Sequence, residues 1–363
     1  MELDIIFLMN PILGGAERNL RTIAEESARS GRYVKIIFLC DSEQGVWQRM
    51  NERIECVSVG ALNEKVGLLA ARSIIKKFSR EYEVNRVYSS QVHLNGMLCL
   101  YRIMGILKCE HLIIRESTVI ADRFKGLRKY EFLLFYSFYK KIDLLICQTE
   151  YMRKRLLDFV PRLERFHPAI IPNPVNVERA VKMADEPIFD IEQYGSYIVT
   201  VGRLIETKGG DLLIQAFSQV LKKHQSMKLM FIGDGEELSH WQSLTEKLGV
   251  SDSVFFMGHI DNPFPYLKYS VLGVVASRRE GFPNVLLEMM SVCQRVVSTH
   301  CAGGIAEIPG IYDCPANNEN ALAEAMIESL EGDSKLRVEL MRNEVFKRTP
   351  KAFLDEISNA LIK

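Results

Sequence analysis

Short apolar runs alternate with amphipathic stretches along most of the chain. In the first half, the runs typical of buried strands are residues 5–9, 34–40, 86–89, 112–115 and 144–148, and helical patterns cover 68–80 and 130–140. In the second half, the corresponding runs are 197–201, 228–232, 254–257, 271–276 and 295–298, with helical stretches between most of them. Strands that alternate with helices predict a parallel sheet covered on both faces. The pattern therefore predicts two α/β halves.

The alternation stops at the sequence IPNPVN, residues 171–176. Two prolines and two asparagines cannot continue a helix or a central strand, so we expect a hinge at 172–176 and an irregular polar segment to about Gly195. The predicted domains are 1–172 and 173–349, both Rossmann-like. The last stretch, 353–362, is apolar at helical spacing. It predicts a helix within 350–363 that packs on the first domain.

Composition limits the classes of protein that fit. A chain of 363 residues exceeds one ordinary core, and 47% hydrophobic with 25% charged residues argues against disorder. Lys+Arg and Asp+Glu number 46 each, so net charge does not indicate a nucleic-acid partner. The eight cysteines show no C-x-x-C spacing, which favours reduced thiols in a cytoplasmic protein. The N-terminus MELDIIFLMN lacks the basic start of a signal peptide, and no apolar run is long enough to span a bilayer.

Two carboxylates bracket a turn in SRREGFPNVLLE, residues 277–288. Pro283 suits the first turn of a helix, and the amides around that turn favour partial negative charge or sugar oxygens. Glu280 lies before the turn. Glu288 interrupts an apolar face, where a carboxylate needs hydroxyl or N–H donors such as those of a ribose diol. The alternative is that Glu280 caps the helix and Glu288 pairs with a core arginine.

Two cations follow another predicted strand in VGRLIETKGGDLL. Gly202 allows close backbone approach, and Arg203 with Lys208 would suit a diphosphate, although solvated surface charges are the alternative. FIGDGEEL (231–238) and CAGGIAEI (301–308) are two further strand ends with glycines. Ligands of open α/β sheets bind at the carboxyl ends of strands. Four such loops in one half therefore predict a ligand site.

With these motifs in this order, the sequence resembles the family 4 retaining glycosyltransferases, which have the GT-B fold of two Rossmann-like α/β domains facing across a cleft. The likeness is specific over 198–308 and in the first half depends mainly on one Gly-Gly loop. Ala276, Cys293 and Arg295 depart from residues common in the family. The residues that carry the resemblance are Gly14-Gly15-Ala16-Glu17, Gly202-Arg203-Leu204 with Lys208-Gly209, Gly233-Asp234-Gly235, Glu280-Gly281-Phe282-Pro283 with Glu288, and Gly303-Gly304 with Glu307.

The resemblance implies a role for each site residue. Glu280 would contact hydroxyls of the donor sugar, and Glu288 the ribose. Arg203 and Lys208 would stabilise the charge that grows on the leaving diphosphate. The base would lie near 258–260, and Pro283 has no N–H to offer. The whole implied donor site is Gly14, Gly15, Gly202, Arg203, Lys208, Gly233, Gly235, His259, Ile260, Glu280, Gly281, Phe282, Pro283, Asn284, Val285 and Glu288.

Two residues of the first half are further candidates. His93 follows a strand in SSQVHLNG, and the resemblance implies that it lines the cleft and joins Arg203, Lys208 and Glu280 as a catalytic candidate. The alternative for His93 is a satisfied loop histidine. Glu116 could orient an acceptor hydroxyl, but we favour a surface role for it.

The expected activity is transfer of a sugar, with retention, from a nucleotide diphosphate donor to a glycan hydroxyl. A UDP-sugar is favoured over a GDP-sugar, and the resemblance implies an acceptor in bacterial surface polysaccharide (O-antigen or capsule), carried on a lipid. No Asp-any-Asp pair occurs, so no metal is expected, and no cofactor beyond the donor substrate. A sugar-nucleotide epimerase, which would need acid/base groups at the sugar's C2, and a non-catalytic donor-binding subunit are the alternatives.

One region bears on localisation. Residues 122–165 hold eleven Lys/Arg and six Asp/Glu, a net charge of +5, with aromatics interleaved in KYEFLLFYSFYKK. Such a face suits anionic lipid headgroups at the inner side of the plasma membrane. The alternative is a core-facing helix with solvated ends, which we favour for the aromatics.

Overall fold

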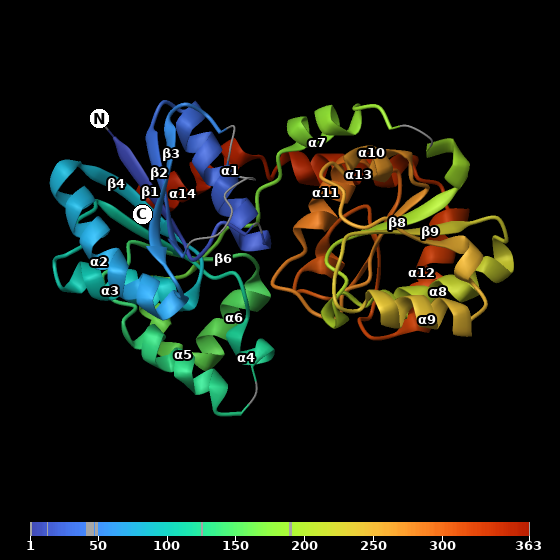
Figure 1. Cartoon of the computed structure of the whole chain (residues 1–363), viewed down its shortest axis with the longest axis horizontal. Coiled ribbons are helices and arrows are strands. Elements are labelled where there is room, and N and C mark those ends of the chain that lie inside the picture. The colour runs from blue at the N-terminus through green and yellow to red at the C-terminus, as the bar shows by residue number, and fades with distance from the viewer. Residues whose placement is uncertain are drawn as a thin grey trace. The chain divides into compact units, whose positions relative to one another are not determined.

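The computed structural model describes residues 2–12, 14–40, 47, 50–124, 126–188 and 191–362. The chain divides into two compact units, Met1–Pro174 with Pro350–Lys363, and Val175–Thr349. Each unit contains one parallel sheet with helices on both faces (Figure 1). This arrangement confirms the predicted fold class of two Rossmann-like α/β units.

The first unit has a seven-stranded sheet in the order β3-β2-β1-β4-β5-β6-β7. Its strands are β1 (Leu3–Leu8), β2 (Tyr33–Cys40), β3 (Ile54–Ala61), β4 (Val84–Ser89), β5 (His111–Arg115), β6 (Leu144–Cys147) and β7 (Ala169–Ile170). Its helices are α1 (Gly15–Arg29), α2 (Glu64–Glu81), α3 (Val92–Ile103), α4 (Ile120–Arg123), α5 (Arg128–Ser137), α6 (Glu150–Phe159) and α14 (Pro350–Ile362).

The second unit has a six-stranded sheet in the order β10-β9-β8-β11-β12-β13. Its strands are β8 (Tyr197–Val201), β9 (Lys228–Ile232), β10 (Val254–Phe256), β11 (Leu272–Val275), β12 (Val296–Thr299) and β13 (Tyr312–Cys314). Its helices are α7 (Val177–Ala184), α8 (Gly210–Lys223), α9 (Leu238–Lys247), α10 (Phe264–Tyr269), α11 (Asn284–Val292), α12 (Glu319–Glu331) and α13 (Lys335–Phe346).

Each sheet is buried on both faces because its central strands are mostly apolar. In β1, Ile5 and Phe7 pack with α2, α3, α5 and α6, whereas Ile6 and Leu8 pack on the opposite face with α1 and α14. The second sheet is divided in the same way, with α7, α10, α11 and α13 on one face and α8, α9 and α12 on the other. Continuous apolar runs are what a doubly covered parallel sheet requires.

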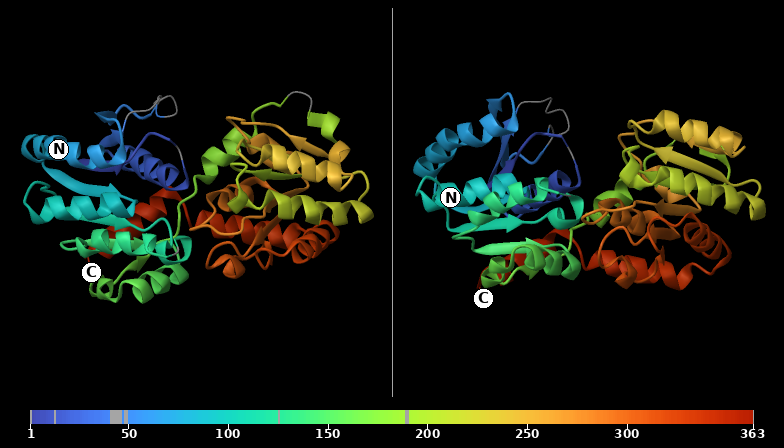
Figure 2. Two further views of the ribbon diagram at one scale, coloured as in Figure 1. Left: turned by 60° about the horizontal axis from the view of Figure 1, so that its bottom comes forward. Right: turned by 90° about the horizontal axis from the view of Figure 1, so that it is seen from below.

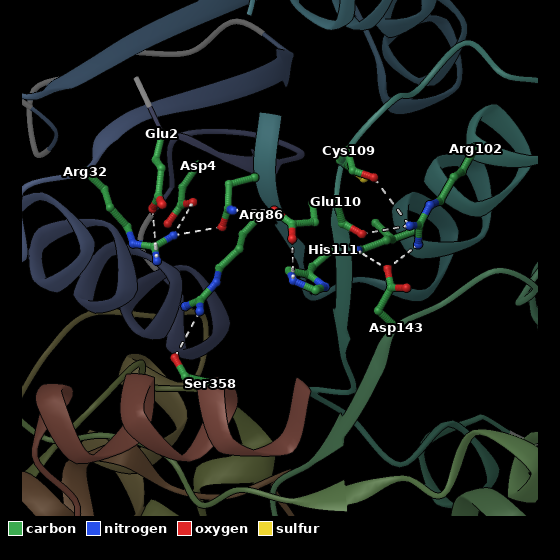
Figure 3. A network of polar contacts seen from close by, with 12 residues as sticks. Glu2, Asp4, Arg32, Arg86, Arg102, Cys109, Glu110, His111, Asp143 and Ser358 are labelled. Atoms are coloured by element: carbon green, nitrogen blue, oxygen red, sulfur yellow. Dashed lines mark hydrogen bonds and ion pairs between the residues drawn. The ribbon is translucent and has the colours of Figure 1, made fainter. Parts of the chain in front are cut away.

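The C-terminal helix α14 packs on the first unit (Figures 1 and 2). Phe353, Leu354 and Ile357 are buried in the cluster that also contains apolar residues of α1 and β1. Arg86 of β4 donates a hydrogen bond of 3.0 Å from Nη2 to Oγ of Ser358 (Figure 3). The helix is therefore held by an apolar face and a polar contact.

The structure differs from the sequence-based expectations at several elements. Strands β3, β7 and β13 were not predicted. The segment expected to be irregular after residue 176 begins with α7, so that expectation was wrong. The Asn176 side chain accepts a hydrogen bond of 2.9 Å from the Arg179 amide and caps this helix, while Val177, Ala180 and Ala184 are buried at helical spacing. Within the described residues, no helix combines the length and apolarity needed to cross a bilayer.

Candidate functional site

The motifs of the second half gather at one edge of the second sheet. Strands β9, β8, β11 and β12 are neighbours and run parallel, so the loops that follow them emerge on the same side. These loops are the GRLIETKG, GDGE, SRREGFP and CAGG segments of the sequence. Ligands of open α/β sheets bind at this edge, where the order of strands reverses direction. Here the reversal falls between β8 and β11.

The central contact of this edge joins Lys208 to Glu280, which are 72 positions apart in the chain. Lys208 Nζ lies 2.8 Å from Glu280 Oε1, and Ser277 Oγ donates to the same oxygen at 2.5 Å. The Glu280 amide donates to the carbonyl of Cys301 at 2.7 Å, which brings in the loop after β12. Both charged side chains stay partly exposed, at 27% and 17%. Pro283, rather than Glu280, occupies the N-cap position of α11.

Glycines let these loops pack backbone against backbone. Gly233 has φ of +138°, and a Cβ there would stand 2.0 Å from the carbonyl oxygen of Gly202. Gly209 has φ of +66°, and its Cβ would stand 2.2 Å from the carbonyl oxygen of Ala276. A side chain at either position would separate the loops. The glycines therefore bring the strand ends close enough to form one site.

The loop after β10 is joined to the same edge. The Gly233 amide donates to the Gly258 carbonyl at 2.8 Å, and the His259 amide donates to Asp234 Oδ2 at 2.9 Å. The Leu204 amide donates to the Asp234 carbonyl at 2.8 Å. Residues 258–260, predicted to lie near the base, are thereby connected to the loop that carries Arg203.

A pocket opens among the loops after β8 and β11. Gly202, Arg203, Lys208, Ser277 and Val285 all contribute to its lining. Arg203 is exposed, and Lys208 is partly buried. Glu288 is partly buried one turn after Asn284 on α11, so these two residues lie on the same helix face. Gly235, Ile260, Gly281, Phe282 and Pro283 belong to the loops of this edge or to the start of α11.

The Gly-Gly loop lies at the carboxyl end of β1 in the first unit. Gly14 is the N-cap of α1, and Gly15 is its first residue. Glu17 Oε1 accepts a hydrogen bond of 3.0 Å from Nε2 of Gln91, which follows β4. A Cβ on Gly14 would meet Glu17 Oε2 at 2.6 Å. The glycine thus leaves room for the Glu17 carboxylate beside the loop.

His93 lies in the first turn of α3 and packs against α5. Its ring stacks on Phe132 with centroids 4.8 Å apart, and meets Phe135 edge-on at 4.6 Å. Burial lowers the pKa of His93 below its ordinary value, so the neutral ring is favoured. The histidine is on a helix rather than in a loop, and aromatic packing accounts for its position.

The expectation that Glu116 occupies the surface was wrong. Glu116 is 1% exposed, and its carboxylate accepts hydrogen bonds from the hydroxyls of Tyr139 at 2.9 Å and Tyr136 at 3.1 Å. Burial raises its pKa to about 7. The position after a strand did not reveal this, because both tyrosines lie in the distant aromatic run KYEFLLFYSFYKK.

Sequence reasoning also missed Arg115, the residue before Glu116. Its guanidinium is 2% exposed and donates from Nη2 to Oδ1 of Asn173, in the predicted hinge segment. Burial lowers the pKa of Arg115 to about 10. This contact attaches the end of β5 to the segment where the chain leaves the first unit.

The described residues contain no group of three or more His, Cys, Asp or Glu arranged to hold a metal ion. All eight cysteines lie among the described residues, where they form no disulfide, and five of them are buried.

The chain has two parallel α/β units, and the second carries a pocket lined by Arg203 and Lys208 at the carboxyl edge of its sheet. Two such units are the architecture of the GT-B fold. HepE of Anabaena, in complex with UDP and glucose, has this architecture with a TM-score of 0.78 and 16% identity, and the alignment covers 99% of each chain. At that identity the similarity shows the fold.

Residues 184–344 match the model of the family "Glycosyl transferases group 1". The matched residues lie within the second unit, Val175–Thr349, which is thus similar to the glycosyl transferases group 1. It is 30% identical over 241 residues to an uncharacterized glycosyltransferase of Methanocaldococcus jannaschii, covering 65% of this chain and 59% of that protein. It is 29% identical over 221 residues to the lipopolysaccharide core biosynthesis glycosyltransferase LpsE of Rhizobium meliloti, covering 57% and 63%. The chain thus spans less than two thirds of the length of either relative.

Proposed function

We propose that the protein is a retaining glycosyltransferase of family 4 that transfers a sugar from a nucleotide diphosphate donor to a glycan hydroxyl. The observation that carries the proposal is the 2.8 Å contact between Lys208 and Glu280, beside a pocket that Lys208 and Arg203 line. An ammonium and a guanidinium suit a diphosphate, and a carboxylate accepts hydrogen bonds from sugar hydroxyls. The UDP in HepE favours a UDP-sugar, with a GDP-sugar as the second choice.

The chemistry follows from where charge develops. As the anomeric C–O bond breaks, negative charge grows on the leaving diphosphate, and Lys208 with Arg203 stabilise it more in the transition state than in the ground state. Retention follows when the acceptor hydroxyl attacks from the leaving group's own face and a diphosphate oxygen takes its proton. We propose that the two cations replace a metal and that the reaction needs no further cofactor.

Other residues of the edge would bind the rest of the donor. Glu288, on the same helix face as Asn284, would accept hydrogen bonds from the ribose hydroxyls. The backbone of 258–260 would border the base. Backbone amides of Gly281, Phe282, Asn284 and Val285 would approach the sugar or the diphosphate, as at other helix starts.

The proposed activity is tested by nucleotide release from a panel of UDP- and GDP-sugars, with and without glycan acceptors. We expect Arg203→Ala and Lys208→Ala each to lower turnover by about 10² to 10³, the effect of removing one donor to a developing anion. Lys222→Ala, at an exposed position near the end of α8, is the control and should retain full turnover. Normal rates in either pocket variant would remove that residue from catalysis. Release of a C2-inverted sugar would indicate an epimerase, and binding without release a non-catalytic subunit.

We further propose that the acceptor is a bacterial surface polysaccharide, O-antigen or capsule, carried on a lipid. The role named for LpsE, lipopolysaccharide core biosynthesis, supports this class of acceptor. Helix α5 and the residue before it present exposed apolar side chains at helical spacing, Leu127, Tyr130 and Leu134, at 86%, 54% and 60% exposure. Lys129 Nζ lies 5.3 Å from the ring centroid of Tyr130. We call Leu127, Tyr130 and Leu134 the α5 surface.

We propose that the α5 surface rests on anionic headgroups at the inner face of the plasma membrane. Apolar side chains beside lysine are the usual elements of such contacts. Sedimentation with vesicles containing phosphatidylglycerol tests this, with phosphatidylcholine vesicles and a Tyr130→Ser/Leu134→Ser variant as controls. We expect binding to anionic vesicles that the variant weakens. No binding at low salt would exclude the contact.

A further inference from the structure

A second ion pair lies beside the Lys208–Glu280 contact, and the proposed chemistry does not use it. Arg278, two residues before Glu280, donates from Nη1 to Asp211 Oδ1 at 2.8 Å and from Nη2 to Asp211 Oδ2 at 2.6 Å. Asp211 lies in the first turn of α8, three residues after Lys208. Both side chains are largely buried, at 23% and 21% exposure. Two parallel bonds of this kind fix orientation as well as charge.

Arg278 also holds the turn that carries Lys208. Its Nη1 donates to the carbonyl of Glu206 at 2.9 Å, and its own amide donates to the carbonyl of Thr207 at 2.8 Å. These are the two residues immediately before Lys208 in the short helical turn Glu206–Lys208. The loop after β11 is therefore attached to the loop after β8 on both sides of Lys208. Because lysine has a long, flexible side chain, the position of its backbone limits where its ammonium can reach.

The pair also cancels a charge that would oppose anion binding. Asp211 stands at the start of α8, close in sequence to the two cations of the pocket. Burial raises the pKa of Asp211, but the hydrogen bonds and charge of Arg278 outweigh it and hold that pKa below its ordinary value. The carboxylate is thus ionised, and its charge is neutralised by Arg278. Without Arg278, Asp211 would repel a diphosphate and compete for Lys208.

We propose that Arg278 and Asp211 form a clamp that positions Lys208 and Glu280 for the donor diphosphate, which makes them positioning residues rather than catalytic ones. The inference depends on the proposed function and deepens it. Of the guanidinium nitrogens, Nη1 and Nη2 are already occupied by Asp211 and the Glu206 carbonyl. Three of the five N–H donors of Arg278 are thereby used within the loops, which supports a positioning role.

The test measures UDP affinity by calorimetry and UDP-sugar turnover in a set of matched variants. Arg278→Ala should weaken UDP binding about tenfold or more, because it loosens the Lys208 turn and leaves Asp211 unpaired. The double variant Arg278→Ala/Asp211→Asn should recover part of that loss, since the repelling charge is removed. The exchange Arg278→Asp/Asp211→Arg should recover more of it, because the ion pair is restored.

The exposed ion pair of Lys268 with Asp185, at 2.7 Å between α10 and α7, supplies the control. Lys268→Ala should leave UDP affinity and turnover unchanged. Circular dichroism and melting temperature establish that each variant is folded, and Arg278→Lys replaces the alanine variant if that one is not. The lysine keeps the charge but cannot make the two-pronged contact, so an intermediate affinity is expected.

The outcomes separate the clamp from the proposed function. If the wild-type protein binds neither UDP nor GDP and releases no nucleotide, the proposed function fails and the clamp fails with it. If the wild type binds UDP and folded Arg278→Ala binds it equally well, only the clamp is overturned. The clamp is also overturned if Arg278→Lys restores binding and neither the double variant nor the exchange does. That pattern would mean that Arg278 contacts the ligand directly.

Discussion

The buried carboxyl of Glu116 should make the stability of the first unit depend on pH. Its two hydrogen-bond donors, the hydroxyls of Tyr136 and Tyr139, do not compensate for the loss of water around a charge, and burial raises the pKa to about 7 from an ordinary value of 4.5. The Glu116→Gln variant keeps the shape and an accepting oxygen but cannot ionise. Comparing the two proteins isolates the cost of the buried charge.

The sign and size of the effect follow from proton linkage. A pKa that is higher in the folded state means that the folded protein holds a proton that the unfolded chain releases. The stabilisation is complete below pH 4.5 and is lost as the pH rises through about 7. Between roughly pH 5 and pH 8 the wild type should lose about 2.5 kcal/mol of unfolding free energy relative to Glu116→Gln.

Urea unfolding followed by tryptophan fluorescence measures this difference. The chain has two tryptophans, Trp47 in the first unit and Trp241 in the second. In a Trp241→Phe background, Trp47 alone reports the unit that contains Glu116. Tyr139→Phe, which removes one donor to the carboxylate, should shift the loss of stability to higher pH. A difference between wild type and Glu116→Gln that stays constant from pH 5 to pH 8 would refute the buried-charge account.

Three further substitutions test the packing. Gly233→Ala would place a Cβ 2.0 Å from a carbonyl oxygen, so we expect calorimetry to show a loss of UDP affinity. The control Gly249→Ala meets no atom within 4 Å and should keep UDP affinity, at a cost of only about 1 kcal/mol in unfolding free energy. Equal UDP affinity in the two variants would contradict the loop packing. Arg32→Ala removes the guanidinium that lies 3.3 Å from the fully buried Asp4, and it should lower the unfolding free energy of the first unit in urea by about 3 kcal/mol. Adding Asp4→Asn should restore much of this loss. An unchanged unfolding free energy in Arg32→Ala would show that the ion pair is unimportant. Phe353 is 3% exposed in the core of the first unit, so Phe353→Ala should lower the unfolding free energy, followed by Trp47 fluorescence, by about 3–5 kcal/mol. An unchanged unfolding midpoint would mean that α14 is not part of that unit.

The sequence predicted the central strands well and the edge strands poorly. Strands β8 and β9 match their predicted ranges because both are largely apolar and are followed directly by a glycine. Strand β3 was missed because it is an edge strand with mixed exposure and carries polar residues such as Glu55 and Ser58. Helix α7 was missed because the two prolines of IPNPVN predict an irregular segment, although Asn176 is a suitable N-cap residue. Local pattern cannot show that a helix resumes directly after a break.

The candidate site was predictable only in part. Four glycine-bearing strand ends could be identified from the sequence, because apolar runs followed by glycines indicate strand ends. The sequence did not show which strands are neighbours in the sheet. The adjacency of β8 and β11 brings Lys208 to Glu280. Partners far apart in the chain were missed altogether. Glu116 lies 20 and 23 positions from its two tyrosines, and Arg278 lies 67 from Asp211.

A crystal structure of the protein with a bound UDP-sugar tests the central claim most directly. We predict that a diphosphate oxygen lies within about 3 Å of Lys208 Nζ, with Arg203 on the same group and Glu280 facing the sugar hydroxyls. A nucleotide bound elsewhere in the chain, with these three side chains directed away from it, would contradict the account.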